Sequence, residues 1–96
     1  AGMHIIAEHY QRVEHCLVAP RGATLESLRS VRSHVHALAQ CRQIIARLGL
    51  RAIVAADTAG AAREVSELAD PSVAAISSSL AAEIYGLQVQ IGRAHV

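Results

Sequence analysis

The fold is decided by residues 28–90, LRSVRSHVHALAQCRQIIARLGLRAIVAADTAGAAREVSELADPSVAAISSSLAAEIYGLQVQ, in which short strand patterns alternate with helical ones. β-Branched and apolar residues predict four strands, at Leu28–Arg32, Arg51–Ala56, Val73–Ile76 and Leu87–Gln90. The helical patterns between them stop at Gly49, before Pro71 and at Gly86. Three strand–helix steps in roughly sixty residues predict an α/β fold with parallel strands and covering helices.

Local signals also set the expected helices and an earlier pair of strands. The helical patterns cover residues 33–48, 57–68 and 80–85. Residues 3–8 and 12–19 have the alternating pattern of strands, and Pro20-Arg21-Gly22 breaks the second of them. We expect these two early strands to form a ribbon or hinge.

Composition excludes several classes of function. The net charge is +1, and the chain contains two Tyr but neither Phe nor Trp, so a basic stripe or a stacking platform for nucleic acid is absent. No apolar run reaches the roughly 20 residues of a membrane helix, and the start lacks a signal-peptide pattern. We therefore expect no nucleic-acid partner, no membrane and a cytoplasmic location. Cys16 and Cys41 are expected to be reduced, buried thiols.

Both ends of the chain look internal to a longer protein. Residue 1 leads directly into a strand pattern without a starting Met. The last six residues, 91–96 (IGRAHV), match the translation of a common sequencing adapter, and we exclude them from the fold. Residues 1–90 are then expected to form part of one domain.

The polar residues at the strand–helix junctions are the candidate binding residues. Ser33, Asp57 or Thr58, and Ser77 or Ser78 each follow a predicted strand and precede a helix. In an open parallel sheet these junctions share the edge where ligands bind, and helix starts offer unpaired N–H groups to an anion. The pattern fits a site for a small dicarboxylate. From spacing alone, the pattern fits better a set of residues that only cap their helices.

Other reactive side chains do not form a recognisable site. His34 and His36 stand two positions apart at a predicted helix start, where they should point to different faces, and no further ligand accompanies them at metal-binding spacing. Cys16 and Cys41 fit core packing better than nucleophilic catalysis. The glycines form neither GxGxxG nor a phosphate loop. We predict no metal and no cofactor.

Several blocks of the chain resemble the prephenate dehydratase family along nearly all of residues 3–90. The similar blocks are, in the family's order, His15–Leu17 (HCL), Ser33–Cys41 (SHVHALAQC), Asp57–Ala62 (DTAGAA) and Ala74–Leu87 (AAISSSLAAEIYGL). The resemblance implies the second lobe of a catalytic domain with the type 2 periplasmic-binding-protein fold, in which a parallel or mixed sheet is flanked by helices. It also implies conversion of prephenate to phenylpyruvate with loss of water and carbon dioxide, without a cofactor.

The resemblance implies where the substrate binds. The family's substrate-facing positions fall on Ser33, His34, Asp57, Thr58 and Ala59. The family's Thr-Arg-Phe motif, which carries the catalytic Thr, is missing, so no catalytic residue is assigned and the chain alone is expected to be inactive. The full-length protein is expected to form a homo-oligomer.

Two departures from the family pattern lie at the first junction. Val35 stands where the family usually has Pro, and His36 where it has Gln. Two other functions stay open at this point. One is arogenate dehydratase, whose substrate differs by an amino group; the other is a non-catalytic lobe that binds a small anion.

Overall fold

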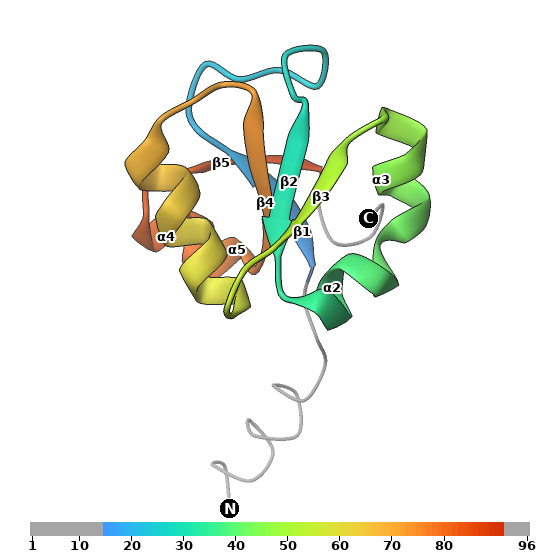
Figure 1. The fold of residues 1–96 in the computed structure, drawn as a ribbon. Coiled ribbons are helices and arrows are strands. Elements are labelled where there is room, and N and C mark those ends of the chain that lie inside the picture. The colour runs from blue at the N-terminus through green and yellow to red at the C-terminus, as the bar shows by residue number, and fades with distance from the viewer. Residues whose placement is uncertain (1–14, 92–96) are drawn as a thin grey trace, which may run out of the picture.

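A five-stranded mixed sheet forms the centre of the structure, a computed structural model in which residues 15–91 are described (Figure 1). The strands run in the order β3-β2-β4-β1-β5 across the sheet. Their bounds are β1 Cys16–Ala19, β2 Ser30–Ser33, β3 Arg51–Val54, β4 Val73–Ser77 and β5 Gln88–Ile91. β2 pairs in parallel with both β3 and β4, whereas β1 is antiparallel to β4 and β5.

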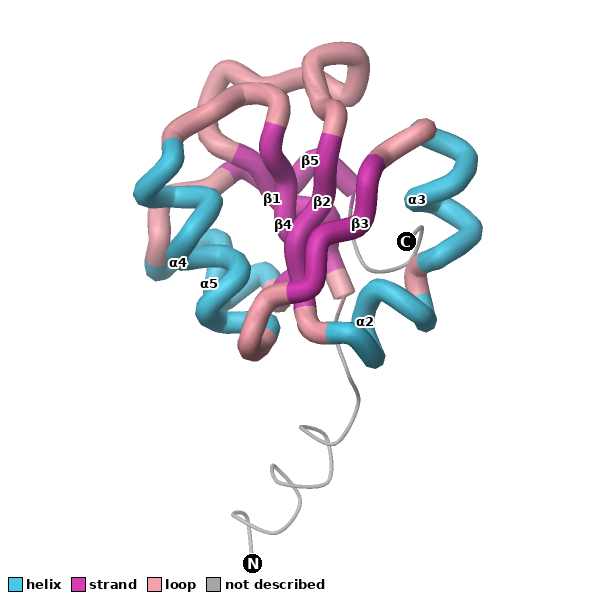
Figure 2. Tube along the Cα trace, viewed as in Figure 1, coloured by secondary structure: helices cyan, strands magenta, loops and turns pink. Residues whose placement is uncertain are grey.

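Helices cover both faces of this sheet (Figure 2). The first pair, α2 (Val35–Gln40) and α3 (Arg42–Leu48), lies on one face, and the second pair, α4 (Thr58–Leu68) and α5 (Ser79–Ile84), lies on the other. Each face has its own apolar cluster: Leu38 and Ile44 pack with Leu17 on the first, and Val65 and Ala82 pack with Val18 on the second. The prediction of an α/β fold with flanking helices is confirmed.

The sequence prediction of one helix over residues 33–48 is wrong in one respect, because the helix is divided at Cys41. Its backbone has φ −104° and ψ 14°, so α2 ends there and α3 begins at the next residue. Cys41 still takes part in main-chain hydrogen bonds of both helices. Its N–H donates to Ala37 O in α2, and its carbonyl oxygen accepts from Ile45 N in α3. Gly49 ends α3 with φ 68°, which confirms the predicted stop.

β1 is the second of the two early strands that are expected to form a ribbon or hinge, and that expectation stays a prediction. β1 lies inside the sheet between β4 and β5, with Leu17 opposite Ile76 and Val18 opposite Val89. All four of its residues are buried, as expected of a strand that is covered on both faces. The other expected strand, at residues 3–8, lies outside the described residues.

The remaining boundaries agree with the prediction to within one or two residues. α4 ends at Leu68, and Ala69 closes it in the left-handed conformation (φ 50°) just before Asp70-Pro71. β5 extends to Ile91, which lies opposite Leu17, while residues 92–96 are outside the described part. Among residues 15–91, none of the helices has the length and apolar character required to cross a membrane.

Candidate functional site at the carboxyl edge of the parallel strands

The carboxyl ends of β2, β3 and β4 meet at one edge of the sheet. Ser33 is in register with Val54 of β3, and Arg32 is in register with Ala75 of β4. The Ser33 hydroxyl donates to the main-chain oxygen of Ile76 at 2.8 Å. The prediction that the strand–helix junctions share one edge is confirmed.

This edge has the geometry of a switch point in an open α/β sheet. β2 continues into α2 on one face, whereas its neighbours β3 and β4 continue into α4 and α5 on the opposite face. Chains that leave adjacent strands toward opposite faces open a crevice outside the strand ends. The candidate site is therefore centred on the end of β2.

His34 occupies the first junction and caps α2. Its Nδ1 accepts a hydrogen bond from the main-chain N–H of His36 at 3.2 Å. The two imidazole rings stack, with centroids 5.0 Å apart and an interplanar angle of 24°. The expectation that the rings point to different faces is wrong, because His34 precedes the helix and has an extended backbone (ψ 150°).

Asp57 occupies the second junction and caps α4. Its Oδ1 accepts a hydrogen bond from Gly60 N, and its backbone is extended. A Cβ at Gly60 would lie 2.9 Å from this oxygen, so the close cap depends on glycine at that position. Thr58 and Ala59 are the first two residues of α4, and their side chains lie outside the described part of the structure.

Ser33 and Ser77 differ from these caps because both are fully buried. The Ser33 hydroxyl is used in the bond to β4, and Ser77 Oγ donates to the carbonyl of Ser78 at 3.2 Å. Ser78 caps α5 by accepting a hydrogen bond from Ala81 N at 3.0 Å. The first junction is thus capped by His34 rather than by Ser33, and substrate binding by Ser33 stays a prediction.

The start of β1 adds His15 to the same edge. Because β1 is antiparallel and Cys16 lies opposite Ser77, this strand begins where its neighbours end. His15 Nε2 lies 2.6 Å from Gln40 Oε1, and its buried Nδ1 has no hydrogen-bond partner. The strand pattern alone did not place His15 here; a fully apolar CLVA run after it was the available sign of a central strand.

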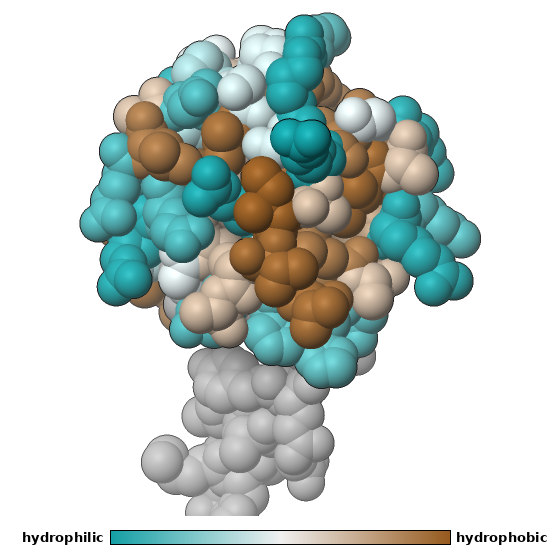
Figure 3. Space-filling view, in the orientation of Figure 1, coloured by the Kyte–Doolittle hydropathy of each residue, from teal (hydrophilic) through white to brown (hydrophobic). Residues whose placement is uncertain are grey.

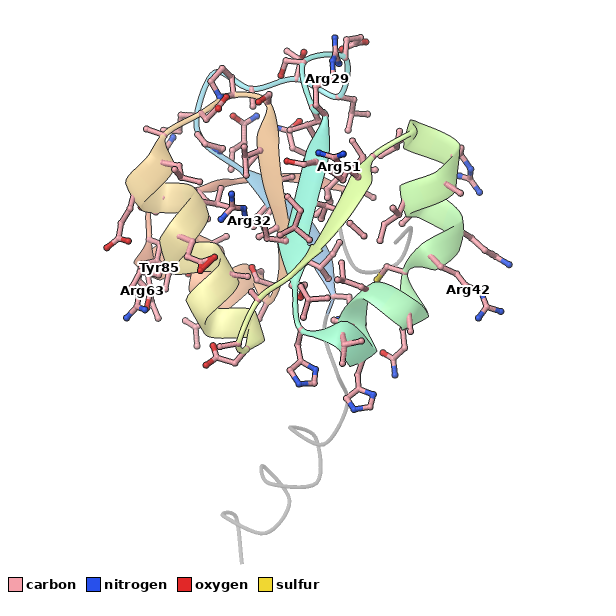
Figure 4. The ribbon with its side chains drawn as sticks, viewed as in Figure 1. Arg29, Arg32, Arg42, Arg51, Arg63 and Tyr85 are labelled. Atoms are coloured by element: carbon pink, nitrogen blue, oxygen red, sulfur yellow. The ribbon has the colours of Figure 1, made fainter. Side chains whose placement is uncertain are left out.

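Electrostatic interactions near the edge are few. Arg32 pairs with Glu64 of α4 at 3.4 Å, and Figure 4 shows Arg32 directed toward that helix. Burial raises the pKa of the Cys41 thiol, which keeps it protonated and poorly nucleophilic. Across residues 15–91, His, Cys, Asp and Glu form no group of three that could hold a metal ion. A hollow is lined by Ala39, Gln40, Arg42 and Gln43.

The sequence of the chain is similar to sequences of known proteins along nearly its whole length. The family model described as prephenate dehydratase matches residues 1–94. A bifunctional N-acyl-homoserine lactone acylase/prephenate dehydratase of Komagataeibacter europaeus is 48% identical over 89 residues, which is 93% of this chain and 32% of that protein. Arogenate dehydratase/prephenate dehydratase 2 of Arabidopsis thaliana, a chloroplastic protein, is 44% identical over 87 residues, 91% of this chain and 23% of that protein.

A solved structure gives the same result for the fold. Prephenate dehydratase from Arthrobacter aurescens in complex with L-Phe superposes with a TM-score of 0.76 at 29% identity, covering 86% of this chain and 28% of that one. The chain therefore spans about a third or less of the length of these relatives. By its sequence and by its fold, the chain belongs to the prephenate dehydratase family.

Proposed function

We propose that this chain forms one lobe of a dehydratase that converts prephenate to phenylpyruvate, with loss of water and carbon dioxide. The observation that carries the proposal is the switch point at the end of β2, which is surrounded by the capped starts of α2, α4 and α5. Family membership implies a prephenate substrate. Turnover would need the rest of the domain, since the relatives are about three times longer or more.

The chemistry of the substrate supports this placement. Prephenate carries two carboxylates. One of them leaves as carbon dioxide, its bonding electron pair enters the ring, and the ring hydroxyl leaves as water with a proton from a general acid in the complete domain. Both groups must be aligned, because the carbon–carbon and carbon–oxygen bonds break together as the ring becomes aromatic. A helix start provides N–H groups and a partial positive charge for one carboxylate, without requiring Lys or Arg.

The residues assigned to this role follow the same logic. The main-chain N–H groups of Thr58 and Ala59 precede the helical ladder of α4 and lack intrahelical acceptors. Asp57 fixes that turn by its bond to Gly60, and His34 fixes the start of α2. We assign Ser33 a positioning role, because its buried hydroxyl holds the end of β2 to β4.

A chimeric enzyme tests the proposal. The segment of the Komagataeibacter relative that matches residues 15–91 is replaced by this chain's segment, and phenylpyruvate formation from prephenate is measured. We expect the chimera to form phenylpyruvate, and we expect the relative without its matching segment to form none. A folded chimera that binds prephenate without turnover would instead support a non-catalytic binding lobe.

The same chimera separates the related activities. Arogenate is supplied in parallel, since relatives of this chain include proteins named as arogenate dehydratases. N-acyl-homoserine lactone is supplied as a third substrate, because the Komagataeibacter relative is also named as an acylase. The preferred substrate is the one with the highest kcat/KM; the isolated chain, assayed alongside, is expected to turn over none of them.

A further inference from the structure

The start of α2 holds His34 in one tautomer. The Nδ1 atom of His34 accepts the main-chain N–H of His36 at 3.2 Å, so this nitrogen carries a lone pair rather than a proton. The proton of the neutral imidazole then lies on Nε2, which has no hydrogen-bond partner within residues 15–91. The cap therefore leaves an uncharged N–H donor at the first junction, one residue after the end of β2.

The ring of His36 restricts the orientation of that donor. The two imidazoles stack with centroids 5.0 Å apart and an interplanar angle of 24°. A ring that is bonded at Nδ1 and packed on one face has less freedom to tilt than a ring that is bonded at Nδ1 alone. Within the described residues, neither ring forms an ion pair with a carboxylate. The uncharged ring that the cap requires is therefore not opposed by a neighbouring negative charge.

Exposed apolar side chains lie at the same junction. Val54 ends β3 in register with Ser33, and Val35 follows His34 in the chain. Val54 is 65% exposed and Val35 is 50% exposed, and Figure 3 shows apolar surface gathered over β3 and the beginning of α2. A ligand that covers this surface excludes water from the junction, which strengthens a hydrogen bond formed there.

We propose that His36 is a positioning residue of the candidate site: its side chain holds the His34 ring so that Nε2–H donates a hydrogen bond to an oxygen of the bound substrate. The inference rests on the dehydratase function proposed above, whose substrate offers carboxylate oxygens as acceptors. The donor binds without transferring a proton. Gln, the residue that the family pattern has at position 36, has no ring to stack on His34.

Nitrogen NMR of the isolated chain tests the arrangement of the two rings without any turnover. The spectrum is recorded at about pH 8, where an ordinary histidine is neutral. We expect His34 to show the Nε2–H tautomer alone and His36, which is exposed, to show a mixture of both tautomers. His36→Gln should broaden or average the His34 signals, and His36→Phe, which keeps a ring, should preserve them. A proton on Nδ1 of His34, or the same tautomer mixture for both residues, would overturn the proposal.

Steady-state kinetics of the chimera test the contact with the substrate. A hydrogen bond that is present in both the bound substrate and the transition state changes KM rather than kcat. His36→Gln should therefore raise KM about fivefold at nearly constant kcat, and His36→Phe should restore most of the loss. Gln43→Ala, on the exposed surface of α3, is the control and should leave both constants unchanged.

The two measurements separate this inference from the proposed function. An unchanged KM in His36→Gln, or a KM in His36→Phe that is raised as far as in His36→Gln, would overturn the role of His36 in an active chimera. A chimera without turnover would contradict the proposed function instead, and the NMR signals of His34 in the isolated chain would then decide whether His36 orients that ring.

Discussion

The Ser33 hydroxyl donates to the main-chain oxygen of Ile76 over 2.8 Å, and both residues are completely buried. The bond joins β2 to β4 at the switch point, one residue before His34 and one residue before Ser77. It fixes the relative position of two strand ends whose following helices leave toward opposite faces. The geometry of the candidate site therefore depends on a side chain that solvent does not reach.

Replacement of Ser33 by Ala should lower the free energy of unfolding by about 1 kcal/mol, because the Ile76 oxygen loses a donor that water cannot replace. Urea denaturation measures the change. Ser30→Ala on the same strand is the control, since Ser30 is only half-buried. Equal effects of the two substitutions would show that the bond to Ile76 does not stabilise the fold.

Asp57 and Gly60 should be energetically coupled. Asp57→Ala removes the cap of α4 and should cost about 1 kcal/mol. Gly60→Ala gains about 1 kcal/mol of helix propensity, but its Cβ would displace the carboxylate 2.9 Å away. The gain should therefore emerge fully only in the Asp57→Ala background.

A double-mutant cycle, followed by chemical denaturation, measures that coupling. Additive effects of the two substitutions would contradict a cap that requires glycine at position 60. The cycle also separates the cap from any role of Asp57 in substrate binding, because it reports stability in the absence of substrate.

The sequence was sufficient for the elements that depend on local signals. Gly49 and Pro71 end helices where predicted, and Asp57 precedes α4 as a cap residue should. The division at Cys41 had no such signal, because neither Gly nor Pro marks it and the apolar spacing continues through it. Tertiary packing of α2 and α3 against the sheet decides that break.

Long-range pairing was the other part that the sequence left undecided. The pattern at Cys16–Ala19 predicts a strand but does not predict which strands pair with it. Its central position, between β4 and β5, is known only from the structure. For the same reason His15 was not recognised at the site edge, and the stacking of the His34 and His36 rings was not predicted. Their positions follow from pairing and from an extended cap residue, rather than from helical spacing.

Asp70 should make stability depend on pH in the acid range. Hydrogen bonds from the N–H and hydroxyl of Ser72 lower the pKa of its carboxyl. Its contribution is therefore present above the unfolded-state pKa of about 4 and is lost as the pH falls through the lower folded-state value. Asp70→Ala should melt below the wild type near neutral pH, and the difference should close in strong acid.

Thermal melts across the acid range check this expectation for Asp70. Glu67→Ala, which removes another exposed carboxylate of the same region, controls for the change in net charge. A Tm difference for Asp70→Ala that stays constant down to strong acid would show that the hydrogen bonds to Ser72 do not govern it.

A substitution at Thr58 distinguishes a role in substrate binding from a role in capping α4. Asp57 is the cap of α4 and Thr58 is its first helical residue, so Thr58→Ala should change the free energy of unfolding by less than about 0.5 kcal/mol. If the start of α4 binds the substrate through Thr58, the same substitution in the chimera should lower kcat/KM at least about tenfold, a loss of about 1.4 kcal/mol of transition-state stabilisation. Steady-state kinetics well below the melting temperature measure this, with Glu67→Ala at the far end of the helix as control. Unchanged kinetics would show that the Thr58 side chain does not bind the substrate. The main-chain N–H groups of this turn and His34 would then be the remaining candidates for binding.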